Sequence, residues 1–415
     1  MIEMLPTRHL WLWHASWLFS CARQWRGPAC VLTSAAMAVV LAGLVYWQSN
    51  TACRNEDKPL TDKRSLMLAG DAGLLNDTAR ALAGMNVSAG SFLEPLTRDK
   101  AFAKHSELLN RAWDAVEARQ LAKVRAWSSE NLTRPQPALF YMFSGPDFLY
   151  ANAFFPKAVT YVMAGLEAPG DIPDLARLPR PAIASELAGL RASLKSILGH
   201  SFFITREMQR MLNGRRLAGT LPVLFVFLAR SGNTITSVSF VTIDENGTLH
   251  SLNTPQEKKG KAAAAGAMGV KITFSGDGSQ LRTLFYFKTD LSNRGTKKSG
   301  FLKFCRQFGT GDSLLKAASY LVHHDNFSNV RSFLLGQSAA IVQDDSGIPL
   351  RDFNAQEWDL KPFGQYTRPI RLFTRSYQPD LKELFAKESA QPLEFNLGYQ
   401  ARHGGSGILL AVRTR

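Results

Sequence analysis

The segment richest in residues that can do chemistry is FSGPDFLYANAFFP, residues 143–156. A strand-like run ends here in Ser144 and Asp147, and a dense aromatic stretch follows. Many α/β active sites place a hydroxyl and a carboxylate at a strand end, and aromatic side chains can wall a pocket. The alternative is a tight turn capped by Asp147, with the aromatic residues filling the core. We take Asp147 as a candidate catalytic residue and Ser144 and Tyr150 as candidate ligand-binding residues.

A second candidate segment is VQDDSGIP, residues 342–349, where Asp344 and Asp345 directly precede Ser346. Paired carboxylates can share a proton or bind a hard cation. Adjacent residues of a strand point to opposite faces, so only one of the pair is expected to face a given site. The alternative is a turn that carries two solvated acids. Both aspartates are candidate catalytic residues, and Ser346 is a candidate ligand-binding residue.

His323 and His324 are predicted to end a helix that begins near residue 312. Consecutive helical side chains diverge by about 100°, so these two histidines are poor joint ligands for one ion. Neither HExxH nor CxxC spacing occurs, and no metal site is predicted. The simpler interpretation is a cationic helix C-terminus. His323 is nevertheless a candidate partner of Asp147 and the aspartate pair in a hydrolytic site assembled by the fold.

Three common catalytic and nucleotide-binding motifs are absent from the sequence. It has no GxxxxGK[ST] phosphate loop, no GxGxxG dinucleotide turn and no GxSxG nucleophile elbow. Their absence argues against nucleotide-driven chemistry and against the commonest serine hydrolase architecture. No cofactor is predicted.

The elements that position these segments follow an uncharged stretch from Ala29 to Trp47. Its 19 residues would form a helix of about 28 Å, enough to cross a hydrocarbon core of about 30 Å. Three arginines precede it, which by the positive-inside rule places the N-terminus in the cytoplasm. We predict a cytoplasmic leader (1–28), a transmembrane helix or signal (29–48), and a single-pass membrane protein with its ectodomain in the periplasm or outside the cell.

The span has three possible fates: a retained anchor, a cleaved secretory signal, or a lipoprotein signal that ends at Cys53. Thr51 and Ala52 supply small residues before Cys53, but Asn50 stands where an aliphatic residue is expected. A leader added by an upstream start codon is a further alternative for the first residues. The four cysteines imply no disulfide framework, and Cys305 is expected to pack as a small buried residue.

The charge distribution points to anionic partners. The net charge is +15, and residues 1–52 hold three arginines against one glutamate, so residues 53–415 carry +13. A basic ectodomain is attracted to anionic lipid, to polysaccharide or to an acidic envelope protein. Export argues against a nucleic-acid partner.

The pattern after the span predicts an α+β fold with a helical N-terminal layer and a mostly antiparallel sheet. We expect a tether (49–61), a helical segment (62–134) with two antiparallel helices, and an α+β ectodomain (135–415). Strands are expected at 138–144, 159–166, 221–229, 234–243, 248–252, 270–275, 281–288, 338–343, 366–373, 393–398 and 408–413. Helices are expected at 183–198, 202–213, 312–323 and 379–387.

Four segments together resemble an uncharacterised family of bacterial envelope proteins. They are FSGPDFLYANAFFP, LLKAASYLVHH (314–324), QDDSGIPLRDF (343–353) and FGQYTRPIRLF (363–373). The likeness spans about residues 64–413 and implies a secreted or lipoprotein-anchored ectodomain. It implies no activity and no catalytic roles, because the family has no established ones.

These observations lead to three hypotheses. The first is a membrane-anchored envelope protein whose basic ectodomain binds an anionic component or partner. The second is a hydrolase with a site around Asp147 and Asp344 or Asp345. The third is a structural scaffold, which a pocket closed by Phe154 and Phe155 would favour.

Overall fold

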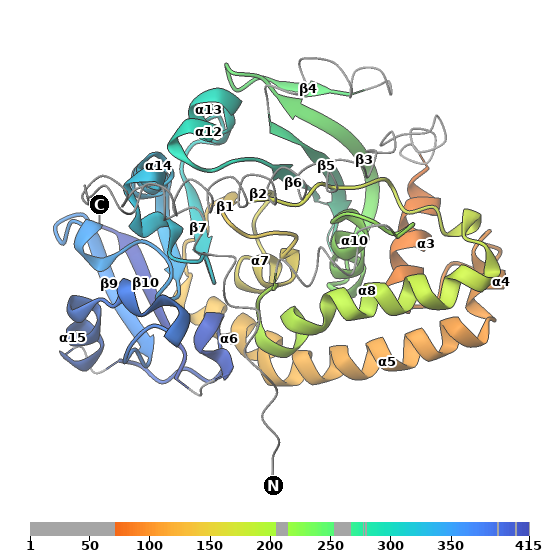
Figure 1. Ribbon diagram of the computed structural model, residues 1–415, viewed down its shortest axis with the longest axis horizontal. Helices are drawn as coiled ribbons and strands as arrows, with labels where there is room; N and C mark the ends of the chain where they lie inside the picture. The colour runs from red at the N-terminus through yellow and green to blue at the C-terminus, as the bar shows by residue number, and fades with distance from the viewer. Residues whose placement is uncertain are drawn as a thin grey trace, which may run out of the picture. The chain divides into compact units, whose positions relative to one another are not determined.

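Ten strands form one sheet in the computed structural model (Figure 1). Contacts divide the chain into two units, Met1–Lys58 and Pro59–Arg415. The structure describes residues 71–204, 215–252, 267–276, 278, 280–387, 390–402 and 405–414, all in the second unit. The strands are β1 (Ala138–Tyr141), β2 (Thr160–Gly165), β3 (Thr234–Ile243), β4 (Leu249–Ser251), β5 (Ala267–Ser275), β6 (Leu281–Lys288), β7 (Gly311–Leu315), β8 (Ser338–Gln343), β9 (Trp358–Gly364) and β10 (Gly407–Arg413).

Eleven α-helices occur among the described residues. They are α3 (Ala72–Leu82), α4 (Glu94–Thr97), α5 (Lys100–Val116), α6 (Ala122–Asn131), α7 (Phe148–Phe154), α8 (Arg180–His200), α10 (Leu221–Arg230), α12 (Asn293–Ser299), α13 (Phe301–Arg306), α14 (Ser328–Gln337) and α15 (Pro379–Lys387). A π-helical turn, η1 (Glu117–Leu121), joins α5 to α6. The predicted α+β class is confirmed.

The sheet is mixed and mostly antiparallel, in the order β4-β3-β5-β6-β2-β1-β7-β8-β10-β9. Five of the nine neighbouring pairs are antiparallel, and they lie in the two flanks. The five central strands, from β6 to β8, run parallel. Parallel neighbours need a crossover, and α7 supplies it between β1 and β2 while α14 supplies it between β7 and β8. The parallel centre was not predicted from the sequence.

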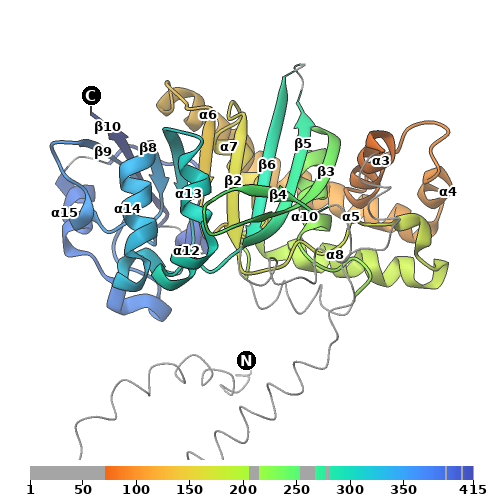
Figure 2. The same cartoon turned by 90° about the horizontal axis from the view of Figure 1, so that it is seen from above.

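The two faces of the sheet bury separate apolar cores. Along β1 the side chains alternate, with Leu139 and Tyr141 in one core and Phe140 and Met142 in the other. Helices α3, α5, α6, α7, α8 and α10 cover the first face, and α13, α14 and α15 cover the second (Figures 1 and 2). The crossovers α7 and α14 therefore lie on opposite faces.

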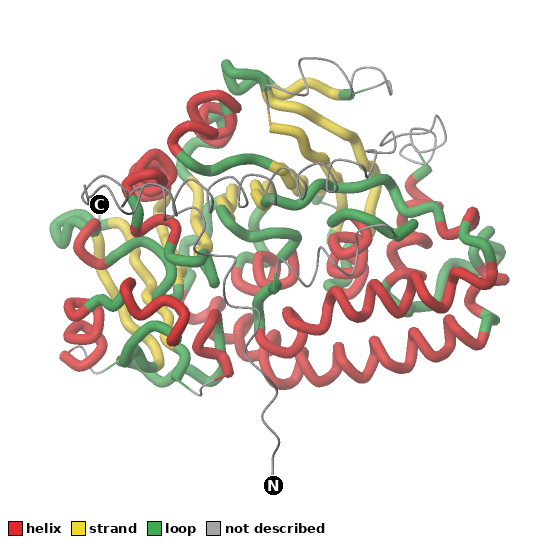
Figure 3. Tube along the Cα trace, in the orientation of Figure 1, coloured by secondary structure: helices red, strands yellow, loops and turns green. Residues whose placement is uncertain are grey.

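The N-terminal helices do not form the predicted antiparallel pair. Helix α3 packs on α10 and β3, whereas α5 lies beside α8 (Figure 3). The buried ring of His105, on α5, connects α5 to α3 and to α8. Its Nε2 lies 2.9 Å from the carbonyl oxygen of Leu82 on α3, and Arg191 of α8 donates to its Nδ1 at 2.9 Å. Burial lowers the pKa of His105 to about 4, so the ring is neutral at pH 7 and can donate at one nitrogen while it accepts at the other.

The predicted strand at 221–229 is wrong, since these residues form helix α10. Nine of its ten residues are buried, including Phe225 and Phe227, so the sequence shows no polar face. A short apolar run without polar positions has no periodicity that separates a buried strand from a buried helix. Pro222 in the first turn is consistent with the helix, because that position needs no backbone donor.

Four further predictions are corrected. The helix expected at 312–323 is strand β7 followed by a 3₁₀ turn, η4 (Leu321–His323). The strand expected at 366–373 overlaps a 3₁₀ segment, η7 (Arg371–Ser376), and residues 393–398 form no strand. The stretch FLKFCRQF (301–308) around Cys305 has an alternating pattern typical of a strand, but it contains helix α13; the cysteine is buried as expected. Short buried strands and 3₁₀ turns span too few residues for the periodicity of apolar positions to identify them.

Several predicted segments lie outside the described residues. They include the span 29–48, Cys53 and most of the helix predicted at 202–213. Among the residues that the structure does describe, none belongs to a helix with the length and apolarity needed to cross a membrane.

Candidate functional site

The candidate site lies where the connections of the parallel strands diverge. From β1 the chain crosses through α7 to β2 on one side, and from the neighbouring β7 it crosses through α14 to β8 on the other. In open sheets, ligands bind outside the carboxyl ends of strands at such a point. Asp147, Lys316 and the pair Asp344–Asp345 all follow the carboxyl ends of β1, β7 and β8. The topology therefore brings these residues to one edge of the sheet.

Asp147 forms a buried ion pair with Lys316. Nζ of Lys316 lies 2.8 Å from Oδ2 of Asp147, and the two side chains are 1% and 2% exposed. Tyr141 donates to the same oxygen at 2.7 Å, while Oδ1 accepts the Tyr150 backbone N–H at 3.0 Å and so caps α7. Burial raises the pKa of Asp147, and the charge of Lys316 opposes that rise. The sequence offered a tight turn capped by Asp147 as the alternative; the residue caps helix α7, and its carboxylate also holds a cation.

The ammonium group of Lys316 has two further contacts. It donates to the backbone carbonyl of Ser201, just after α8, and it lies 4.4 Å from the centre of the Tyr150 ring. Tyr150 is fully buried, and its hydroxyl has no hydrogen-bond partner among the described residues. Its ring therefore supports the lysine through a cation–π contact. Tyr150 was predicted to bind a ligand, and in this structure it contacts Lys316.

Asp344 is held by the turns that follow β7 and β8. Its Oδ2 accepts the Ala317 N–H at 2.8 Å, and its Oδ1 accepts the backbone N–H and the hydroxyl of Ser346 at 2.9 and 2.5 Å. Burial raises the pKa of Asp344, and the hydrogen bonds from Ser346 and Ala317 oppose the rise. Ser346 also accepts the Ala318 N–H at 2.7 Å, so this candidate ligand-binding residue ties the two turns together.

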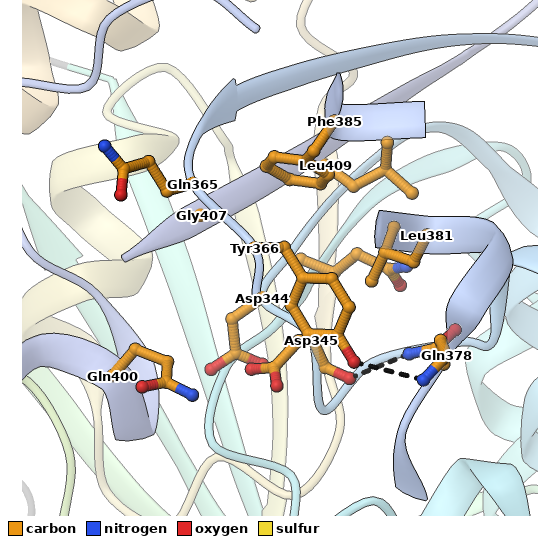
Figure 4. A pocket seen from close by; sticks show the side chains of 11 residues that line it. Asp344, Asp345, Gln365, Tyr366, Gln378, Leu381, Phe385, Gln400, Gly407 and Leu409 are labelled. Carbon is orange, nitrogen blue, oxygen red and sulfur yellow. Dashed lines mark hydrogen bonds between the residues drawn. The ribbon is translucent and has the colours of Figure 1, made fainter. Parts of the chain in front are cut away.

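Asp345 points to different partners from Asp344. Its carboxylate accepts the Tyr320 hydroxyl at 2.5 Å, and its backbone carbonyl accepts the Gln378 amide at 3.2 Å. The backbone N–H of Gln378 donates to the Tyr366 hydroxyl oxygen at 3.1 Å (Figure 4). Burial raises the pKa of Asp345 to about 7, and the charge of Asp344 adds to the rise. The alternative of two solvated acids is wrong, because these residues are only 3% and 9% exposed.

Both aspartates line one small cavity, which is also bordered by Gln343, Gln400 and Leu409 (Figure 4). Its volume of about 10 Å³ is close to the minimum that holds one water molecule. The cavity therefore admits no substrate as large as a sugar or a peptide. A reaction at this site would require the surrounding turns to open.

His323 and Ser144 lie at the border of the cluster. The His323 ring packs edge-on against Tyr320, with ring centres 5.2 Å apart. Burial, followed by the charge of Arg351, lowers the pKa of His323 to about 4. The helix C-terminus expected at His323 is wrong, because this residue lies in the 3₁₀ turn that follows β7. Ser144 donates to the backbone carbonyls of Gly145 and Ala164, at 2.8 and 3.2 Å, which fixes the turn before Asp147.

Backbone strain is concentrated around the same cluster. Five described non-glycine residues have a left-handed backbone, with φ between 50° and 69°: Phe143, Ser201, Ala317, Ser319 and Tyr320. All five lie in the turn after β1, in the turn after β7 or at the end of α8. Each such residue costs on the order of 1–3 kcal/mol, and residues of this kind gather at functional sites.

Half-buried aromatic side chains cover the strained turn 317–320. Tyr399 donates to the Ala317 carbonyl at 2.8 Å and shares a hydrogen bond with Ser319 at 2.9 Å. Its ring centre lies 5.1 Å from that of Phe202 and 5.3 Å from that of Phe373. These three side chains come from separate segments, so their movement would expose the turn without unfolding the sheet.

Sequence reasoning missed Lys316, Tyr141 and Tyr320. Lys316 was assigned to a helix, where a single lysine carries no signal. The signal that could have identified it is a lone lysine directly after the two leucines that end β7. Phe154 and Phe155 do not close the site, because Phe154 packs against Trp127 and Phe395 in the core.

Replacing Asp345 with Asn is expected to change the pH dependence of folding stability. The folded state binds the Asp345 proton more tightly than the unfolded state, because the pKa is raised from 3.8 to about 7. The resulting stabilisation is complete below about pH 4 and is lost as the pH rises towards 7. The stability difference between wild type and D345N should therefore fall over this range and then level off, as measured by denaturant unfolding. A difference independent of pH would contradict the assignment, and D359N at an exposed site serves as the control.

Comparison with known proteins gives no relative for this chain, since no family model, curated protein or solved structure matches it. In the described part of the chain, no group of three or more histidine, cysteine, aspartate or glutamate side chains is placed to hold a metal ion.

Proposed function

We propose that this chain is an acid–base hydrolase whose site is the cluster of Asp147, Lys316, Asp344 and Asp345. One observation carries the proposal: buried charges and all five strained non-glycine residues of the described chain meet outside the carboxyl ends of β1, β7 and β8. A scaffold gains little from such an arrangement, because apolar residues of similar volume stabilise a core as well as a buried ion pair does.

The cluster supplies the groups that hydrolysis needs. In the proposed reaction the aspartate pair takes a proton from a water molecule as its oxygen attacks the substrate, and returns a proton to the leaving group. A carboxyl group with a pKa of about 7, that of Asp345, can do both at neutral pH. Lys316 would stabilise negative charge that develops on the attacked group, and Asp147 is its positioning residue. Access requires the aromatic cover of Phe202, Phe373 and Tyr399 to move.

The experiment compares wild type and D345N on chromogenic carboxylic esters, phosphate esters, glycosides and peptide anilides. We expect kcat/KM to fall by about 10²–10⁴ in D345N on any substrate that wild type hydrolyses. The wild-type rate should titrate near pH 7 and the residual rate of D345N should not. D359N is the matched control, because Asp359 is half-exposed and pairs only with Lys361 in the described structure. No hydrolysis by wild type, or equal rates in D345N, would overturn the proposal.

A second candidate function is the binding of an anionic envelope component by a membrane-anchored ectodomain. The +13 charge of residues 53–415 and the uncharged stretch 29–48 motivate it. A basic groove elsewhere on the described unit favours it specifically.

A further inference from the structure

A groove of about 740 Å³ opens at the end of the sheet opposite to the aspartate cluster. Lys157 lies just before β2, Arg282 near the start of β6, and Asn233 just before β3. Trp113 of α5 and Arg230 of α10 also line the groove. Because β1, β2 and β6 are parallel, their amino ends lie at this groove and their carboxyl ends lie towards the aspartates. The volume falls within the range of about 300–1,000 Å³ typical of small-ligand sites.

Arg282 is held rigidly and keeps its charge unpaired with any described carboxylate. Its Nε donates to the Ala158 carbonyl at 2.9 Å, and its other nitrogens donate to Asn152 at 3.2 Å, to Asn233 at 3.4 Å and to the Tyr161 hydroxyl. Its guanidinium also stacks over the Tyr161 ring at 5.1 Å. All these partners are neutral, so they fix the position of the guanidinium without cancelling its charge.

The other charges of the groove leave a positive surplus. Glu117 is the one acidic side chain among the lining residues, and its charge is compensated by an ion pair with Arg125. Arg230 donates to the Ala83 carbonyl at 2.8 Å and to the Asn110 amide oxygen at 2.5 Å. Lys157 is exposed and forms no ion pair with a described residue. Arg282, Arg230 and Lys157 therefore face the groove together as cations, and among the described carboxylates the exposed Asp114, outside the groove, acts on Arg230.

The remaining lining suits hydroxyl groups and a ring face. The amide of Gln280 and the hydroxyl of Ser231 offer both donors and acceptors, and the amide of Asn152, whose oxygen accepts from Arg282 and Tyr161, offers its NH₂ group. The half-buried indole of Trp113 borders the groove beside Arg230, whose guanidinium lies 5.8 Å from the ring centre. An inorganic anion would use only the cations, whereas a sugar would also use the amides, the hydroxyl and the indole.

We propose that this groove binds a saccharide that carries a carboxylate or a phosphate. This inference gives the second candidate function its site and does not depend on the hydrolase, because the two sites lie at opposite ends of the parallel strands. The cations neutralise the acidic group, and the amides and indole hold the sugar ring.

The test is isothermal titration calorimetry of the full chain with four probes. They are a galacturonic acid trimer, its neutral methyl ester, glucose 6-phosphate and inorganic phosphate. We expect the trimer or the sugar phosphate to bind, the methyl ester to bind at least about tenfold more weakly, and affinity to fall with added salt. Binding of the trimer identifies a carboxylate ligand, and binding of glucose 6-phosphate alone identifies a phosphate ligand.

Two groove variants and two controls separate the site from general charge. K157Q removes an exposed charge with no described ion-pair partner, and R282K keeps the charge but loses the planar fork. Each should weaken binding by about tenfold. K297Q, on α12 of the other face, should bind as wild type does, and so should D345N, whatever its effect on hydrolysis.

Three results would overturn the proposal. The first is absence of binding by both anionic sugars. The second is equal affinity for inorganic phosphate and the sugars, which would show that no saccharide is recognised. The third is an equal loss of affinity in K297Q and K157Q, which would show attraction by the whole surface.

Discussion

The single variant Lys316→Met is expected to lower the free energy of unfolding by about 3–5 kcal/mol. It removes the partner of a carboxylate whose side chain is 2% exposed and leaves that charge buried. Asp147→Asn alone should cost a comparable amount, because it strands the ammonium group of Lys316. The double variant K316M/D147N should recover most of the loss, since it leaves no buried charge while an amide oxygen still caps α7. Chemical denaturation of all four proteins gives the coupling energy.

The outcome of this double-mutant cycle distinguishes the hydrolase hypothesis from the scaffold hypothesis. Additive losses would contradict a coupled buried pair. If the double variant recovers its stability, a scaffold should keep every property of wild type, whereas the hydrolase should lose its activity. Lys387→Met provides the control, because its pair with Glu383 is exposed and should contribute less than about 1 kcal/mol.

Gly398→Ala is expected to destabilise the fold by about 3 kcal/mol or more. Gly398 has a φ of +63°, and a Cβ there would lie 1.8 Å from Oδ2 of Asp344. Besides the left-handed backbone cost of about 1–2 kcal/mol, the carboxylate would have to leave the Ala317 N–H. Thermal or denaturant unfolding measures the change.

Gly309→Ala is the matched control for that substitution. Gly309 has a similar φ of +69°, but a Cβ there would meet nothing within 4 Å. The Gly309→Ala variant should therefore lose only the part of the free energy of unfolding that comes from the left-handed backbone. Equal losses in the two variants would mean that Gly398 exerts no constraint on Asp344.

The sequence located most of the candidate site but not its central cation. Asp147 and the aspartate pair were identifiable because each follows a strand-like run and precedes a turn, and short polar side chains at such places cap and bind. Lys316 was not identifiable, because its importance depends on contact with Asp147, 169 positions earlier in the sequence. Contacts of this kind arise from strand order, and a single sequence carries no signal for strand order.

The fold was predictable where polar and apolar residues alternate. The hairpin β5–β6 and the helix α15 lie where the pattern placed them. The pattern failed at α10, where nine of ten residues are buried and no polar face remains, and at β7, whose five residues Gly-Asp-Ser-Leu-Leu are all buried and do not alternate between polar and apolar. The parallel arrangement of the central strands was not predicted, because fully buried strands show no alternation of polar and apolar residues.

The position of β10 has a consequence for biosynthesis. Residues 407–413 form an inner strand, paired with β8 on one side and β9 on the other. Until these residues have been synthesised, β8 and β9 each present an unpaired edge that can join other strands. The growing polypeptide therefore cannot join β8 to β9 in one sheet before residues 407–413 have been synthesised, and these two edges stay open to other strands until then.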